Sequence, residues 1–146
     1  MKKVLVVALM LGAGLAYASS LGVPWFADNA ATGSNPPASN GDLAQIYLHS
    51  NCPTVLEVTI EYYTATGVPI GPAAPYNTFF IDPNSSLAFR PVKSDTTSES
   101  TASIIIPDRP LGTEGGNDNK KNGSLVLSWT GPVDWLQGSY RLSQCK

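Results

Sequence analysis

His49 is the only histidine in this sequence, so a serine–histidine or cysteine–histidine nucleophile would have to use it. It follows Tyr47 at a spacing of two, which places both side chains on one face of an extended strand. No Gly-x-Ser-x-Gly sequence occurs, and one histidine with two cysteines does not complete the four ligands of a structural zinc site. The pattern favours a surface histidine, and we expect no catalytic residue, no metal and no cofactor.

Cys52 and Cys145 are the only cysteines, and in an exported chain two cysteines form a disulfide more often than a metal or redox pair. The bridge would close most of the chain into one loop, which in the chain-entropy model stabilises by up to about 4–5 kcal/mol. Cys52 follows the first clear strand and Cys145 follows the last. We predict this disulfide, and it forms most easily if those two strands run parallel and side by side.

Two carboxylates, Glu57 and Glu61, share one face of a predicted strand. Four residues at about 3.3 Å per residue separate them by about 13 Å, more than the roughly 5–9.5 Å used by paired carboxylates in glycoside hydrolysis. A hydrolase would instead need carboxylates from distant loops to converge, such as Asp95, Glu99, Asp108 and Glu114. We expect a non-enzymatic protein.

Exposed aromatic side chains are the remaining candidates for binding. Tyr63 and Trp135 are predicted to point outward or to lie in a loop, where aromatic rings can stack on sugar rings. Tyr47, Tyr76 and Phe80 belong to the same set. The alternative is structural, because Trp135 and Tyr76 could instead close the open ends of a sandwich.

Alternating polarity predicts the elements that hold these residues. In residues 54–64, Leu56, Val58, Ile60 and Tyr62 fall on one face and mostly polar side chains on the other, as in a half-buried central strand. Further strands are predicted over residues 43–50, 77–81, 86–92, 102–106, 124–130 and 138–144. We expect residues 43–50 to form a hairpin with residues 54–64, and residues 77–81 to form one with residues 86–92.

Seven short strands without helical periodicity predict an all-β fold, an antiparallel β-sandwich of about seven strands. The expected organisation is a signal peptide over residues 1–18, an apolar arm and linker over residues 19–41, and the sandwich domain over residues 42–146.

The first 18 residues have the form of a secretory signal. Lys2 and Lys3 precede a short apolar run, and Ala16-Tyr17-Ala18 offers small residues two apart for cleavage. The apolar run is well short of the roughly 20 residues of a spanning helix. We expect a secreted protein, periplasmic, on the cell surface or extracellular, with no membrane span in the mature chain.

The apolar arm, residues 21–26, contains Val23, Trp25 and Phe26, and the linker that follows is rich in Gly, Pro, Ser and Asn. The arm is either an edge strand, where proline is tolerated, or a free apolar segment, and we expect its Trp-Phe pair to pack on its own domain or on a neighbouring chain. Val23, Trp25 and Phe26 are therefore candidate interaction residues.

Charge excludes one class of partner. Without Lys2 and Lys3 the chain has seven Lys and Arg against eleven Asp and Glu, so nucleic acid is not an expected partner.

The sequences VLEVTIEYY, NTFFIDPNSSLAFRPV and LVLSWTG together resemble the secreted bacterial immunoglobulin-like or fibronectin-type sandwiches, over about residues 43–145. Neither cysteine lies in mid-strand, unlike those of true immunoglobulin domains. The resemblance implies an immunoglobulin-like fold and no particular activity.

Two functions remain open. The first is a structural or adhesive domain at the cell surface or in the extracellular matrix, whose arm adds as a strand to another copy or to another surface protein. The second is a carbohydrate-binding module that uses exposed aromatic residues.

Overall fold

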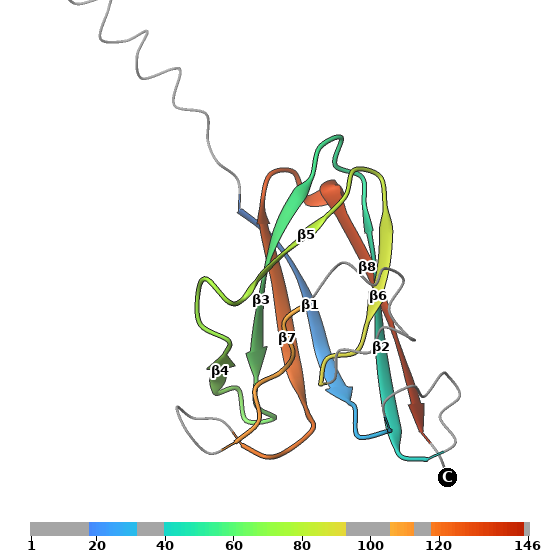
Figure 1. Cartoon of the computed structure of the whole chain (residues 1–146), viewed down its shortest axis with the longest axis vertical. Coiled ribbons are helices and arrows are strands. Elements are labelled where there is room, and N and C mark those ends of the chain that lie inside the picture. Colours follow the sequence, from blue (N-terminus) through green and yellow to red (C-terminus); the bar gives the residue numbers. More distant parts are fainter. Residues whose placement is uncertain (1–17, 32–39, 93–105, 113–117, 145–146) are drawn as a thin grey trace, which may run out of the picture.

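The computed structural model describes residues 18–31, 40–92, 106–112 and 118–144, which form two antiparallel sheets facing each other (Figure 1). The strands are β1 (Ala18–Ala27), β2 (Asp42–Ser50), β3 (Leu56–Tyr63), β4 (Pro69–Gly71), β5 (Thr78–Ile81), β6 (Ser86–Phe89), β7 (Asn122–Thr130) and β8 (Leu136–Gln144), and the 3-10 helix η2 (Val133–Trp135) precedes β8. The all-β prediction is confirmed for these residues. The predicted strand over residues 102–106 falls, except for Ile106, outside them.

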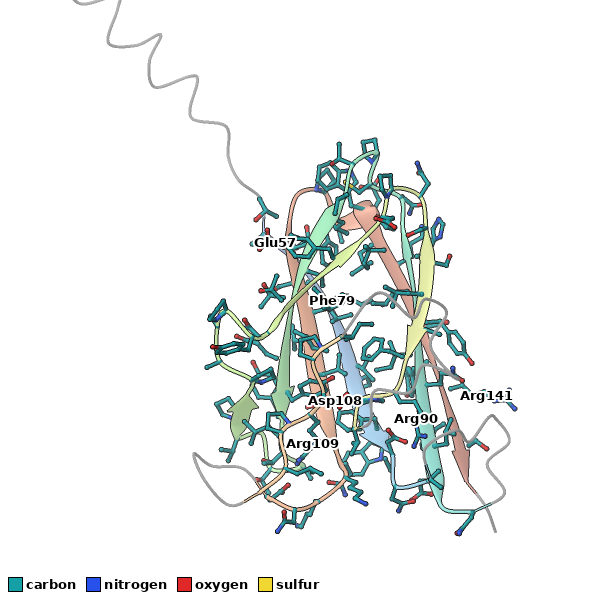
Figure 2. The ribbon with its side chains drawn as sticks, viewed as in Figure 1. Glu57, Phe79, Arg90, Asp108, Arg109 and Arg141 are labelled. Carbon is teal, nitrogen blue, oxygen red and sulfur yellow. The ribbon has the colours of Figure 1, made fainter. Side chains whose placement is uncertain are left out.

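The first sheet has the order β1-β7-β3, with both β4 and β5 on the far side of β3, and the second sheet has the order β6-β2-β8. β3 is thus a central strand, as its composition predicts. Its alternation is also confirmed, because Leu56, Val58, Ile60 and Tyr62 are buried while Glu57 and Glu61 are exposed. Figure 2 shows Glu57 on the outside of the first sheet.

The core lies between the two sheets. Phe79 of β5 and Phe89 of β6 meet across it, with ring centroids 6.5 Å apart, and thereby connect the layers. β2 contributes Ala44, Ile46 and Leu48 to the same core, the face that its alternation predicts.

Both predicted hairpins are wrong. β2 pairs with β6 and β8 in the second sheet, whereas β3 pairs with β4, β5 and β7 in the first. β5 and β6 likewise belong to different sheets. The two connections cross between layers, which alternation alone cannot predict, because an amphipathic strand can bury its apolar face in either sheet.

No helix in the described ranges has the length and apolar character needed to span a bilayer.

Candidate functional site

The apolar arm forms part of an edge strand of the first sheet. β1 pairs antiparallel with β7, from Ala18 opposite Thr130 to Ala27 opposite Asn122. Of the three candidate residues, Val23 and Phe26 are buried in the core, and Trp25 is 41 % exposed. The arm is therefore an integral strand of this fold, the first of the two arrangements that the sequence left open.

A β-bulge explains why neighbouring residues of the arm differ so much in burial. Val23 pairs with Leu125 and Phe26 with Gly123, so Pro24 and Trp25 together oppose Ser124 alone. The extra residue reverses the alternation, which turns Phe26 inward and leaves Trp25 in solvent. A proline and a bulge are both devices that protect an edge strand from unwanted pairing.

The Phe26 ring is fully buried between Tyr62 and Gly123. It meets Tyr62 of β3 edge to face, with centroids 6.1 Å apart. Gly123 is opposite, at a φ of +147°, and a Cβ at that position would lie 2.1 Å from the Tyr63 carbonyl oxygen. Only glycine fits here, since any side chain would collide with that carbonyl group.

The segment that directly follows β1 is held by a buried ion pair between Asp28 and Arg90. The Arg90 Nε donates to Asp28 Oδ1 at 3.0 Å, and neither side chain is exposed to solvent. The Val92 N–H donates to the other carboxylate oxygen, Asp28 Oδ2, at 3.2 Å. Figure 2 shows Arg90 at the end of β6, near the lower ends of the two sheets.

Arg90 also binds the backbone that follows Asp28. Its Nη2 donates to the Ala30 carbonyl oxygen at 2.9 Å, and its Nη1 donates to that of Ala31 at 2.8 Å. A buried guanidinium needs such partners to offset its lost hydration. Arg90 therefore fixes the whole segment from Asp28 to Ala31 against β6.

Sequence patterns do not identify this pair. Asp28 lies in the predicted linker, and Arg90 lies in the strand predicted over residues 86–92, on the opposite face from Phe89. Neither position carries a motif, and the residues are 62 apart in the chain.

Other hydrogen bonds tie down both ends of β1. At its start the Ser19 hydroxyl donates to the Gly131 carbonyl oxygen at 2.7 Å. After its end the Asn29 and Ala30 N–H groups both donate to the Asp42 carbonyl oxygen at 2.9 Å, where β2 begins. The Asp42 N–H returns a bond to Asn29 Oδ1 at 2.6 Å.

The expected parallel arrangement of the strands before the two cysteines is wrong. β2 and β8 are antiparallel neighbours, with Asp42 opposite Gln144 and Ser50 opposite Leu136. Cys52, two residues past Ser50, is a buried free thiol, and Cys145 lies outside the described residues. The predicted disulfide therefore involves a residue outside the described ranges, and the antiparallel register removes only the parallel arrangement that was expected to favour it.

The two aromatic candidates for sugar binding are at opposite ends of the molecule. Tyr63 ends β3, and its hydroxyl donates to Glu61 Oε2 at 2.9 Å. This hydrogen bond, with burial and the negative charge of Glu61, raises the pKa of Tyr63 above its usual value. Trp135 is part of η2 beside the start of β8, packs on the core and covers Gly131. The two side chains form no common platform.

His49 faces outward on β2 as predicted, and its Nδ1 lies 2.7 Å from the Ser86 Oγ of β6. In the described ranges no three His, Cys, Asp or Glu side chains are grouped as metal ligands would be. Of the loop carboxylates that a hydrolase would need, Asp95, Glu99 and Glu114 lie outside those ranges.

Comparison of the chain with known proteins found no matching family model, no matching curated protein and no matching solved structure.

Proposed function

We propose that this chain is a non-enzymatic, exported structural or adhesive domain whose copies assemble by exchanging strand β1. The leader pattern of residues 1–18 supports export. The observation that carries the assembly proposal is the place of β1: it is an edge strand that supplies Val23 and Phe26 to the core and is joined to the domain through residues 28–41.

Exchange should change the free energy little, because β1 is already complementary to its own domain. A second copy offers the same β7 edge, the same site for Phe26 and the same Arg90, so the interactions broken within one chain are remade between two chains. The net change is then small, and the outcome depends on concentration and on the connecting segment. If each copy donates β1 to the next and the series of copies does not close into a ring, a filament grows.

The segment that travels would include Asp28. Its carboxylate must reach an Arg90 guanidinium in the acceptor, since an unpaired buried charge would be strongly destabilising. Residues 32–39, eight residues between Ala31 and Asn40, are long enough to span up to about 27 Å when extended.

We infer also that the sandwich is immunoglobulin-like. β2 pairs with β6 and β3 with β7, as strands B with E and C with F are neighbours in an immunoglobulin sandwich. The strand order departs from the immunoglobulin fold at one edge of each sheet. β1 lies beside β7, where the last strand of that fold would be, and β8 lies beside β2, where its first strand would be.

A disulfide between β1 and β7 tests strand exchange. Ser20 and Ser128 are register partners, and directly opposite residues are about 4.5–5.5 Å apart, within disulfide range. The full chain would carry Ser20→Cys and Ser128→Cys, with Cys145→Ser to prevent mixed bridges. Oxidised as a dilute monomer, this variant should remain monomeric in light scattering and electron microscopy, and reduction should restore assembly.

The same variant reports the strand partner directly. When it is oxidised after assembly, it should give a covalent ladder on a denaturing gel. The thiol introduced by Ser20→Cys in one copy then faces the thiol introduced by Ser128→Cys in the next copy. Chains with Ser20→Cys or Ser128→Cys alone are the matched controls and should assemble without forming a ladder. Assembly that is equal in the oxidised monomer, or a wild-type chain that stays monomeric at all concentrations, contradicts the proposal.

Carbohydrate binding is the alternative function. Tyr63 and Trp135 do not support it as a pair, but Tyr47 of β2 is 37 % exposed. A glycan array probed with the full chain tests carbohydrate binding, and the disulfide variant tests strand exchange separately, because exchange needs no sugar.

A further inference from the structure

The outer face of the second sheet carries a shallow groove of about 660 Å³ that crosses β6, β2 and β8. It is away from the paired edge of β1 and β7, so its side chains keep their places whether or not β1 is exchanged. The residues that line it in register across the three strands are Tyr47, His49, Ser86, Ala88, Gln137 and Ser139.

The cross-strand register explains why this face is hollow. Tyr47 lies opposite Ala88 on one side and Ser139 on the other, so small side chains flank the ring. The next row has His49 between Ser86 and Gln137. Directly opposite residues share a face, so one aromatic side chain stands among short or hydrogen-bonding ones.

Hydrogen bonds hold the two larger side chains in place. The Tyr47 hydroxyl donates to Gln45 Oε1 at 3.2 Å, which ties the ring toward Gln45, on the side away from His49. His49 Nδ1 is 2.7 Å from Ser86 Oγ, which orients the imidazole. A groove whose side chains are already oriented loses less conformational entropy on binding.

The composition of the lining selects a class of ligand. Within the part of the chain that the structure describes, no carboxylate, ammonium or guanidinium group lines the groove, although Arg141 is nearby at the outer edge of β8 (Figure 2). A charged ligand would lose hydration without gaining a partner charge. An amide, an imidazole and two hydroxyls offer both donors and acceptors to a neutral ligand that is rich in hydroxyls.

A peptide fits less well than a sugar. The groove lies across the faces of three paired strands, whose backbone groups are used in the ladders, and strand addition needs a free edge. A pyranose ring combines an apolar C–H face with a rim of hydroxyls, which matches an aromatic surface beside orienting polar groups.

We propose that this groove binds a neutral oligosaccharide, with the Tyr47 ring as the stacking surface and His49, Gln137 and the two serines as hydrogen-bonding partners. The site is distinct from Tyr63 and Trp135 and would give an assembled domain its adhesive capacity.

The test uses the full-length chain and immobilised polysaccharides of two kinds, neutral (cellulose, chitin, dextran, mannan) and anionic (alginate, heparin). Binding to at least one neutral polysaccharide is expected, and calorimetry with its soluble oligosaccharide then gives the dissociation constant. Tyr47→Ala should weaken binding about tenfold or more, an effect of the size expected when an aromatic ring is removed from a binding surface. Tyr47→Phe, which keeps the ring, should retain most of the affinity, and Gln137→Ala should lower it severalfold.

Tyr76→Ala is the matched control, because this tyrosine is more exposed than Tyr47 and lies in a loop outside the groove. It should leave binding unchanged, and circular dichroism checks that each variant is folded. Binding to anionic polysaccharides alone, no binding to any neutral one, or equal losses in Tyr47→Ala and Tyr76→Ala would each overturn the proposal. None of these outcomes bears on strand exchange, which is measured separately by the disulfide ladder.

Discussion

Asp28 and Arg90 form an ion pair in which neither side chain is exposed, although one follows the first strand and the other directly follows β6. The pair joins the segment after β1 to the second sheet, so it connects an edge strand of one layer to the other layer. Replacing one partner removes a buried interaction between opposite charges, which is far more costly than losing a surface ion pair.

Asp28→Asn should therefore lower the free energy of unfolding by about 3–5 kcal/mol. Denaturant unfolding followed by tryptophan fluorescence measures it. Asp134→Asn, at an exposed position in η2, is the control and should change stability by less than about 0.5 kcal/mol. A loss in Asp28→Asn no larger than in the control would show that the pair does not hold the segment.

Adjacent substitutions in the arm should have very different effects. Phe26→Ala removes a fully buried ring and should cost about 3–5 kcal/mol, whereas Trp25→Ala, at 41 % exposure, should cost less than about 1 kcal/mol. The same unfolding experiment applies. If both variants are equally stable, β1 is not part of the folded core.

Gly123 should not tolerate a side chain. Gly123→Ala forces a Cβ against the Tyr63 carbonyl oxygen at a strongly positive φ, and should cost about 3 kcal/mol or more. Gly22→Ala, on the adjoining strand with open space around it and no positive φ, should be neutral or slightly stabilising. Thermal unfolding of the two variants in parallel makes the comparison, and a stable Gly123→Ala chain would contradict the β1–β7 register.

The free energy of unfolding should fall at low pH, because protonation of Asp118 removes its interactions with Arg109 and Lys120. Partial burial raises the pKa of this carboxyl group, but hydrogen bonds from Arg109 and from the Lys120 N–H, with the charges of Arg109 and Lys120, outweigh it and hold the pKa below the usual value. A depressed folded-state pKa gives stability that is complete above the unfolded value of about 3.9 and is lost as the pH falls through the folded one.

Asp118→Asn should therefore be less stable than the wild type at pH 7, and the difference should shrink below about pH 4. Unfolding measured from pH 2 to pH 7 checks this. If the free energy of unfolding depends on pH identically in the two chains, Asp118 does not contribute to the loss of stability in acid.

Cys52 should be unreactive in the folded protein, because the residue is 1 % exposed. Iodoacetamide is expected to label it only after unfolding, without prior reduction. Intact mass spectrometry with and without reductant provides the second reading. A mass lower by two hydrogens before reduction would reveal a bridge between Cys52 and Cys145 and so contradict a free Cys52 thiol.

Local alternation is enough to predict which side chains of β3 are buried. Leu56, Val58, Ile60 and Tyr62 face the core because successive residues on a strand point to opposite sides, a property that needs no knowledge of the neighbouring strand. The sequence has no helical periodicity, and its alternating segments lie near most of the observed strands, so the all-β fold is also predictable from the sequence. The bulge at Pro24 and Trp25 is beyond such reasoning, since it depends on the pairing with β7.

Strand partners, by contrast, are decided only by the tertiary structure. An amphipathic strand buries the same face whichever layer it joins, so sequence neighbours such as β2 and β3 can be assigned to one hairpin although they lie in different sheets. The Asp28–Arg90 pair and the groove around Tyr47 follow from that choice of layer. Each joins residues from strands or loops distant in sequence, and only the packing of two complete sheets brings such residues together.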